Sequence, residues 1–221
     1  MPDGTDIRLT RQSGEYLISV NAKPLMSSRM HGSEEALATL ACDDARGIQE
    51  PRVLVGGLGM GFTLRAVLNI LPSAAVVTVA ELVPAVIKWN RCELSSLADH
   101  PLRDPRVRVE VGDVRSTLRA NPGHFDVILL DVDNGPSAFA ATSNAGLYDN
   151  GGVAVAHAAL NTQGTLAVWS AWEDRKFAQR LRFCGFAVDI KPVRARLKKG
   201  GPKHIIFLGR KGRMTDRKIT Q

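Results

Sequence analysis

A glycine-rich segment that follows an apolar run is the feature that most constrains the fold of this chain. The run at 53–56 is followed by Gly57, Gly59 and Gly61, and a helical pattern of apolar residues begins at Phe62. Glycine has no Cβ atom, so it permits a sharp turn and a close approach of the backbone to a ligand. The order of strand, glycine turn and helix is typical of nucleotide-binding α/β folds, and the three glycines are predicted to contact a cofactor.

Three later segments each have the pattern of an apolar strand that leads to an acidic residue. The three acids are Glu81, Asp113 and Asp131. Glu81 lies about twenty residues beyond the glycine turn, a spacing at which a carboxylate can bind both hydroxyls of a ribose. Open α/β sheets bind ligands at the carboxyl ends of their strands, so the acids are predicted to lie along one ligand-binding edge. The alternative is that each acid only caps the helix that follows it.

The flanking segments predict a small β unit before this core and a hairpin after it. Short alternating segments between residues 6 and 27 indicate about three antiparallel strands, and a helix with Ser33 as its N-cap follows. Two further helices are predicted at 84–98 and 172–184. Strands at 186–193 and 204–208 predict a hairpin that adds one antiparallel strand to the sheet.

Composition and charge exclude several classes of protein. With 221 residues, 44% of them hydrophobic, and a mean hydropathy of −0.06, the chain has the composition of a globular protein. No apolar run approaches the ~18 residues of a membrane-spanning helix, and the N-terminus does not resemble a signal peptide. We therefore expect a cytoplasmic location and no membrane partner. Three widely spaced cysteines and five scattered histidines indicate buried thiols and no metal site.

The net charge of +7 is concentrated near the C-terminus. Eleven of the 29 Lys and Arg residues, but only two acidic residues, lie between Asp189 and the end of the chain. Such a cluster is compatible with a nucleic-acid partner. No aromatic residues interleave the basic tail to stack on bases, however, and we favour a solubilising tail.

The position of the second acid distinguishes among nucleotide-binding folds. No Lys-Ser or Lys-Thr pair follows the glycines, which excludes a P-loop, and G-x-G-x-G is not the G-x-G-x-x-G of dinucleotide folds. Asp113 suits the exocyclic amine of an adenine, and Glu81 suits its ribose. This arrangement indicates the class I S-adenosylmethionine-binding fold, in which Leu82 and Val114 are predicted as further cofactor-binding residues.

Four segments together match the pattern of one known family. They are Gly57–Arg65, Val79–Leu82, Asp104–Asp113 and Phe125–Asp131. Over roughly residues 50 to 136 the chain thereby resembles the spermidine synthase family.

The resemblance implies a cofactor, a partner and a set of acidic residues. The cofactor is S-adenosylmethionine or its decarboxylated form, and the partner is a small-molecule acceptor, an amine. Asp131 is expected at the reacting centre with Asp133 as a second catalytic acid, and Glu34 and Asp133 are expected on the substrate side. Members of the family often associate through their N-terminal strands, which implies a homodimer.

Two departures from the family pattern bear on the reaction. Family members carry an aspartate inside the glycine turn, where this chain has Met60, and their D-S-S-D-P run is replaced by the shorter segment 131–136. Aminopropyl transfer to a diamine needs carboxylates that bind the cation and accept its proton. Methyl transfer needs chiefly an oriented nucleophile.

We therefore interpret the chain as a transferase enzyme that binds S-adenosylmethionine or its decarboxylated form. Its main predicted reaction is methyl transfer to a small amine or other nucleophile. The alternative is a polyamine aminopropyltransferase, that is, spermidine synthase activity, and a further alternative is a non-catalytic nucleoside-binding protein. The predicted architecture is a Rossmann-like α/β fold of the class I methyltransferase type with a mostly parallel seven-stranded sheet. A small N-terminal β unit is assigned to 1–30, the cofactor-binding domain to 31–210 and the basic tail to 211–221.

Overall fold

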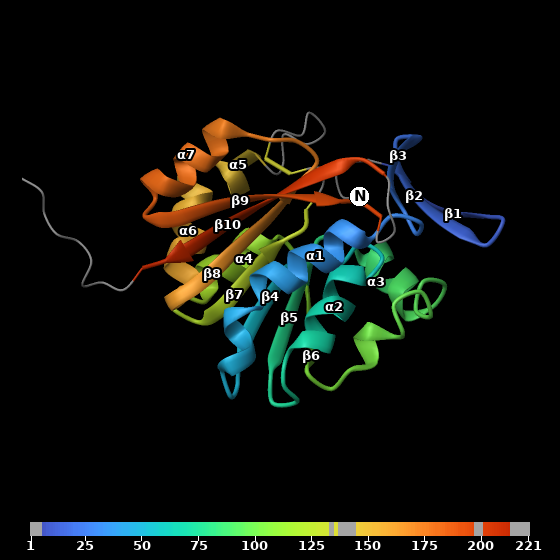
Figure 1. Cartoon of the computed structure of the whole chain (residues 1–221). Helices are drawn as coiled ribbons and strands as arrows, with labels where there is room; N and C mark the ends of the chain where they lie inside the picture. The colour runs from blue at the N-terminus through green and yellow to red at the C-terminus, as the bar shows by residue number, and fades with distance from the viewer. Residues whose placement is uncertain (1–5, 133–134, 137–144, 197–200, 213–221) are drawn as a thin grey trace, which may run out of the picture.

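The computed structural model describes residues 6–132, 135–136, 145–196 and 201–212, and Figure 1 shows them as two sheets with helices around the larger one. The strands are β1 (Ile7–Gln12), β2 (Glu15–Val20), β3 (Lys23–Ser27), β4 (Arg52–Gly56), β5 (Val76–Glu81), β6 (Val107–Val111), β7 (Phe125–Leu130), β8 (Leu160–Ser170), β9 (Phe186–Arg194) and β10 (Lys203–Lys211). The helices are α1 (Gly32–Ala41), α2 (Phe62–Ile70), α3 (Pro84–Arg91), α4 (Val114–Ala120), α5 (Ala145–Tyr148), α6 (Asn150–Ala159) and α7 (Arg175–Phe183), with 3-10 turns η1 (Asp44–Gly47) and η2 (Pro101–Arg103).

The larger sheet has seven strands in the order β6-β5-β4-β7-β8-β10-β9. The pairings from β6 to β8 are parallel, whereas β10 is antiparallel to both β8 and β9. The predicted mostly parallel sheet with a C-terminal antiparallel hairpin is confirmed. The chain leaves β4 towards β5 on one side and later returns to β7 on the other, which opens a crevice at the carboxyl ends of β4 and β7.

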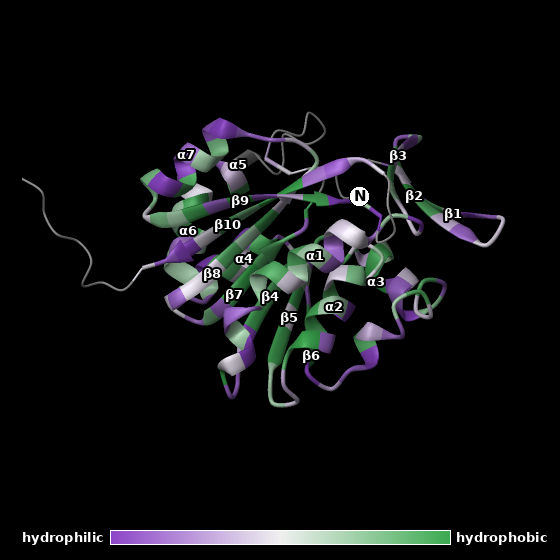
Figure 2. Cartoon of the chain, in the orientation of Figure 1, coloured by the Kyte–Doolittle hydropathy of each residue, from purple (hydrophilic) through white to green (hydrophobic). Residues whose placement is uncertain are grey.

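Alternating side chains of the central strands build two apolar layers. In β4, Val53 and Val55 pack beneath α1 and α2, while Leu54 packs on the opposite face with residues of α4, α6 and α7. A strand covered by helices on both faces needs apolar residues at every position. Figure 2 shows these strands as a hydrophobic centre between helices whose outer surfaces are more polar.

The N-terminal strands form a separate antiparallel sheet in the order β1-β2-β3, which projects from one side of the molecule in Figure 1. The predicted small β unit is confirmed. A sheet this small lacks a core of its own, and its buried Ile18 packs with Met60 of the glycine turn and with Leu94. This contact positions β3 next to the turn.

Three predicted helix boundaries were wrong. Helix α3 ends at Arg91 rather than near residue 98, because the chain turns to bury Leu94 under the N-terminal sheet. Helix α7 begins after Asp174, whose carboxylate accepts a hydrogen bond from the amide of Phe177 and caps the helix. Ser33 is not the N-cap of α1. It lies inside the helix, and its hydroxyl bonds to other side chains instead.

The expectation of three buried thiols holds for Cys42 alone, because Cys92 is exposed and Cys184 is partly exposed. Burial raises the pKa of the Cys42 thiol to about 12. Most of the predicted basic tail, from residue 213 onwards, lies outside the described residues. In the described part of the chain, every helix is too short or too polar to cross a bilayer.

Candidate functional site

The glycine turn runs between the end of β7 and strand β3. Gly57 has a φ of +88°, and a Cβ atom on it would lie 2.3 Å from the carbonyl oxygen of Asp131. Gly59 has a φ of +52°, and its Cβ would lie 3.2 Å from the sulfur of Met26. Gly61, with a φ of +85°, is the N-cap of α2. The turn therefore depends on glycine both for its backbone conformation and for the space it occupies.

Glu81, the acid at the end of β5, holds the glycine turn in place through a hydrogen bond. One oxygen of its buried carboxylate accepts a hydrogen bond from the amide of Leu58, and the other accepts one from Val83, both at 2.8 Å. The next residue, Leu82, is 40% exposed and offers an apolar surface beside this carboxylate. The predicted contact of Glu81 with a ribose stays a prediction.

Asp113, the acid beyond β6, is the N-cap of α4. Its Oδ1 accepts a hydrogen bond from the amide of Arg115 at 2.9 Å, and its Oδ2 pairs with the Arg115 guanidinium. The helix-cap interpretation therefore applies to this acid. A carboxylate has more lone pairs than these contacts use, so the predicted adenine contact stays a prediction. The side chain of Val114 is buried against Gly56, and its predicted cofactor contact stays a prediction.

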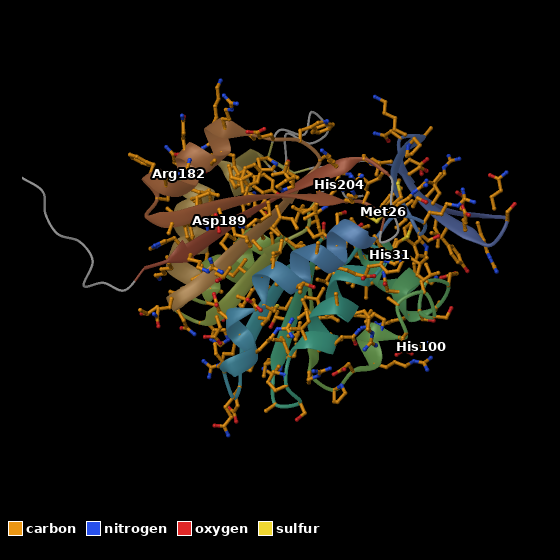
Figure 3. The ribbon with its side chains drawn as sticks, viewed as in Figure 1. Met26, His31, His100, Arg182, Asp189 and His204 are labelled. Atoms are coloured by element: carbon orange, nitrogen blue, oxygen red, sulfur yellow. The ribbon has the colours of Figure 1, made fainter. Side chains whose placement is uncertain are left out.

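A pocket of about 180 Å³ lies on the other side of the glycine turn. It is bounded by the turn, the start of α2, strand β3 and the segment after it, α1, the ends of β7 and β8, and the start of β10. Most of its wall is apolar, with side chains that include Met26, Met30, Met60, Phe62 and Trp169. In Figure 3, Met26, His31 and His204 lie at this end of the molecule, away from Arg182 and Asp189.

Two carboxylic acids, Glu34 of α1 and Asp131 after β7, face this apolar pocket. The Thr63 hydroxyl donates to Oδ2 of Asp131 at 2.6 Å, and the Ser33 hydroxyl donates to Oε2 of Glu34 at 2.6 Å. Burial raises the pKa of Asp131. Burial, with the nearby negative charge of Asp131, raises the pKa of Glu34 to about 7. Among the described residues, neither acid forms an ion pair with Lys, Arg or His.

His204 of β10 completes the polar part of the pocket wall. Its Nδ1 lies 2.9 Å from the Ser33 hydroxyl oxygen, and the indole of Trp169 packs edge-on against its ring with centroids 4.6 Å apart. Burial lowers the pKa of His204, so its neutral form is favoured. Sequence reasoning missed His204 and Thr63. Thr63 follows the glycine turn closely enough to have been considered, whereas His204 is 171 residues from Ser33 and carries no motif.

The structure brings together only some of the predicted site residues. Glu34, Asp131 and Gly59 line one pocket, whereas Glu81 and Asp113 lie at neighbouring strand ends outside its lining. Asp133 falls outside the described residues. No cluster of potential metal ligands occurs in the described ranges, and the expectation of no metal stays a prediction.

No protein-family model matches the chain. It is 34% identical over 178 residues to polyamine aminopropyltransferase 2 of Streptomyces coelicolor, an alignment that covers 75% of this chain and 31% of the relative. The chain thus spans about a third of the length of this curated relative.

Solved spermidine synthases have a similar fold. The enzyme of Thermotoga maritima matches with a TM-score of 0.75 and 17% identity, over 95% of this chain and 70% of that one. A spermidine synthase in complex with the transition-state analogue AdoDATO matches with a TM-score of 0.74 over the same shares. A probable spermidine synthase of Corynebacterium glutamicum has a TM-score of 0.64 and 22% identity, over 94% of this chain and 77% of that one. The similarity inferred from the four sequence segments is therefore confirmed.

Proposed function

We propose that this chain, which is spermidine synthase-like in sequence and fold, transfers an aminopropyl group from decarboxylated S-adenosylmethionine to a small cationic amine. The curated relative is named as a polyamine aminopropyltransferase. That similarity supports aminopropyl transfer, which the sequence analysis gave as the alternative. It does not support methyl transfer, which was the main interpretation of the sequence.

The observation that carries this proposal is the acid pair Glu34 and Asp131 in a pocket whose wall is mostly apolar. Buried carboxylates without a cationic partner are unfavourable, and a bound cation relieves both their desolvation and their mutual repulsion. An alkyl amine matches such a pocket, because its ammonium group pairs with the acids and its methylene groups contact the methionines and aromatic rings. The acid pair supports a cationic amine as the acceptor, and the choice of aminopropyl over methyl transfer rests on the similarity to the named relative.

The fit of the donor rests on the glycine turn. The Gly59 position is open enough that a Cβ atom would approach only Met26, so the backbone of the turn is accessible to a ligand lying over it. We assign the ribose hydroxyls to Glu81, the adenine amine to Asp113 and one face of the base to Leu82. The aminopropyl end then lies above Gly57, Gly59 and Gly61, next to the acid pair.

In this arrangement the residues of the chain bind, orient and deprotonate the acceptor. The donor supplies an electrophilic carbon bonded to a sulfonium, which leaves as a neutral thioether. Asp131 and Glu34 hold the acceptor as an ammonium, and one of them accepts a proton so that the nitrogen lone pair is free to attack. Thr63 fixes the orientation of the Asp131 carboxylate through its 2.6 Å hydrogen bond.

Met60 is consistent with this assignment although the family has an aspartate there. Its side chain lines the pocket and is buried against Ile18 of the N-terminal sheet. We infer that Glu34 supplies, from the opposite wall, the second negative charge that the glycine turn lacks. Asp133, the homodimer, the cytoplasmic location and a nucleic-acid partner stay predictions.

The test is a pair of calorimetric titrations, with intact and with decarboxylated S-adenosylmethionine, each followed by putrescine and spermidine. We expect tighter binding of the decarboxylated donor and, on incubation with an amine, formation of the aminopropylated product by mass spectrometry. Preference for the intact cofactor, with methylated product, would instead support the methyl-transfer interpretation. Binding of neither donor would leave the non-catalytic interpretation.

A further inference from the structure

The buried hydroxyl of Ser33 connects two titratable groups of the pocket wall. It donates to Oε2 of Glu34 at 2.6 Å, and Nδ1 of His204 lies 2.9 Å from the same oxygen. Ser33 is completely buried, so bulk water does not compete for these bonds. A continuous hydrogen-bonded chain therefore runs from Glu34 through Ser33 to the imidazole of His204.

The protons of this hydrogen-bonded series, from Glu34 through Ser33 to His204, can be arranged in two ways. A serine hydroxyl has one proton to donate and can accept others. While Glu34 is ionised, Ser33 donates to it, and His204 must then carry its proton on Nδ1 and donate to Ser33. When Glu34 is protonated and donates to Ser33, the hydroxyl turns towards His204, which then accepts at Nδ1 and carries its proton on Nε2. Both arrangements use the same heavy-atom positions.

The surroundings of His204 suit a group that accepts and releases a proton. Burial lowers the pKa of its imidazole, so the ring is neutral near pH 7, and Trp169 fixes the ring from its edge. Among the described residues Nε2 has no hydrogen-bond partner, and the residue is only partly buried. The charged groups that act on Glu34 are Asp131 at the end of β7 and Glu35 on α1 itself, and His204 on β10 is connected to Glu34 through Ser33.

Transfer to an ammonium acceptor, which is the function proposed above, releases one proton inside this pocket. We propose that Ser33 and His204 carry that proton from Glu34 to solvent, an inference that rests on the proposed function. One N–H bond of the acceptor breaks and an O–H bond forms on Glu34. The nitrogen electron pair forms the new N–C bond, and the electron pair of the C–S bond goes to sulfur. Once Glu34 is protonated, His204 exchanges its ring protons with water and takes the Nε2–H form, so that Nδ1 can accept. Glu34 then passes its proton to Ser33, the Ser33 proton moves to Nδ1 of His204, and Nε2 releases its proton to water. This restores the ionised Glu34 and the Nδ1–H form of His204.

Two substitutions interrupt this route while keeping the pocket shape. Ser33→Ala removes the hydroxyl, and His204→Asn keeps a donor for Ser33 but has no group that takes up a proton. We expect kcat to fall roughly 100-fold in each variant, the lower range for loss of a proton-transfer group, with KM for the amine little changed. Added imidazole is expected to restore part of the activity of a His204→Ala variant. His124→Asn is the matched control, because His124 precedes β7 at the opposite edge of the sheet.

A second readout needs no turnover. The ring ¹⁵N shifts of His204 in the ligand-free protein report which nitrogen carries the proton. We expect Nδ1–H above and Nε2–H below the pH at which Glu34 titrates, about 7, and no such switch in Ser33→Ala.

The outcomes separate the proton route from the proposed function. Wild-type kcat in His204→Asn or Ser33→Ala, in a protein that does transfer aminopropyl groups, overturns the proton route alone. A tautomer that does not respond to pH or to Ser33→Ala overturns it as well. A wild-type protein that shows the switch but transfers no aminopropyl group to any amine overturns the proposed function, and with it the role of the route in that reaction.

Discussion

Four acids of the candidate site form two pairs in contrasting surroundings. Glu81 and Asp113, the turn-side acids, accept hydrogen bonds from backbone amides, and Asp113 also pairs with a guanidinium. Glu34 and Asp131, the pocket acids, receive hydrogen bonds from the hydroxyls of Ser33 and Thr63, and the charge of Asp131 acts on Glu34. Backbone amides and a guanidinium favour the charged form of a carboxylate, whereas burial beside a like charge favours the neutral form.

The difference suggests separate roles for the two pairs, ligand binding for one and proton exchange for the other. Acids whose carboxylates are held in place by backbone amides are suited to bind the hydroxyls and amine of a nucleoside. Acids whose pKa is raised, as in Glu34 and Asp131, are suited to exchange a proton. In the proposed reaction, proton transfer is assigned to the pocket acids, and each prediction below compares one pair with the other or with a matched position.

Asp131→Asn is expected to have the largest effect. The amide keeps the size of the side chain and a hydrogen bond to Thr63, but it has no negative charge and accepts no proton. We expect kcat for aminopropyl transfer to fall by about 10²–10⁴-fold, with donor affinity measured by calorimetry little changed. Asp126→Asn is the control, because Asp126 lies in the same strand at its other end, where it binds the amide of Arg52. Equal loss of donor binding and turnover would instead place Asp131 among the residues that bind the donor.

The sequence predicted the turn-side residues and the two pocket acids, but not the contacts that complete the pocket. Gly57, Glu81 and Asp113 stand in strand–turn–helix units whose spacing is fixed by local geometry, so their positions at the sheet edge followed from periodicity. The pocket joins α1, β7 and β10, and Ser33 meets His204 across 171 residues. No local pattern encodes such a contact, and Ser33 in the first turn of a helix has the sequence signature of a cap. The packing of Leu94, which ends α3 early, was hidden for the same reason.

Gly57→Ala tests why the turn requires glycine. One reason is the positive φ angle of Gly57, and the other is the close approach of Asp131, which follows β7. The new Cβ would meet the carbonyl oxygen of Asp131 at 2.3 Å, in a backbone with a φ of +88°. We expect a loss of about 2–4 kcal/mol in the free energy of unfolding from strain and overpacking together, measured by urea denaturation. Gly14→Ala is the matched control, because Gly14 has a φ of +83° and no atom near its Cβ position. Equal losses in the two variants would mean that the close contact with Asp131 contributes nothing.

Glu34→Gln tests the proton-exchanging character of the pocket acids through stability. The folded protein holds the Glu34 proton more tightly than the unfolded chain does, because the pKa rises from 4.5 to about 7. The stabilisation is therefore full below pH 4.5 and is lost as the pH rises through about 7. We expect this group to lower the free energy of unfolding by about 1–3 kcal/mol between pH 4.5 and 8, and the loss to be absent in Glu34→Gln. Glu35→Gln, altered at the next residue of the same helix, should retain it, and a wild-type-like pH profile in Glu34→Gln would contradict the assignment.

Asp113→Ser is expected to have the smallest effect, and it separates the two roles left open for a turn-side acid. Serine is as good an N-cap as aspartate, and the lost pair with Arg115 is partly exposed and contributes about 0–1 kcal/mol. The free energy of unfolding should therefore change little. The serine side chain is too short to reach a base that Asp113 contacts, so we expect donor binding to weaken by about 1–2 kcal/mol. Asp174→Ser makes the same exchange at the cap of α7 and should leave donor affinity unchanged. If Asp113→Ser binds the donor as tightly as the wild type, Asp113 is a helix cap alone, and the base must be held by Leu82 and the backbone around Val114.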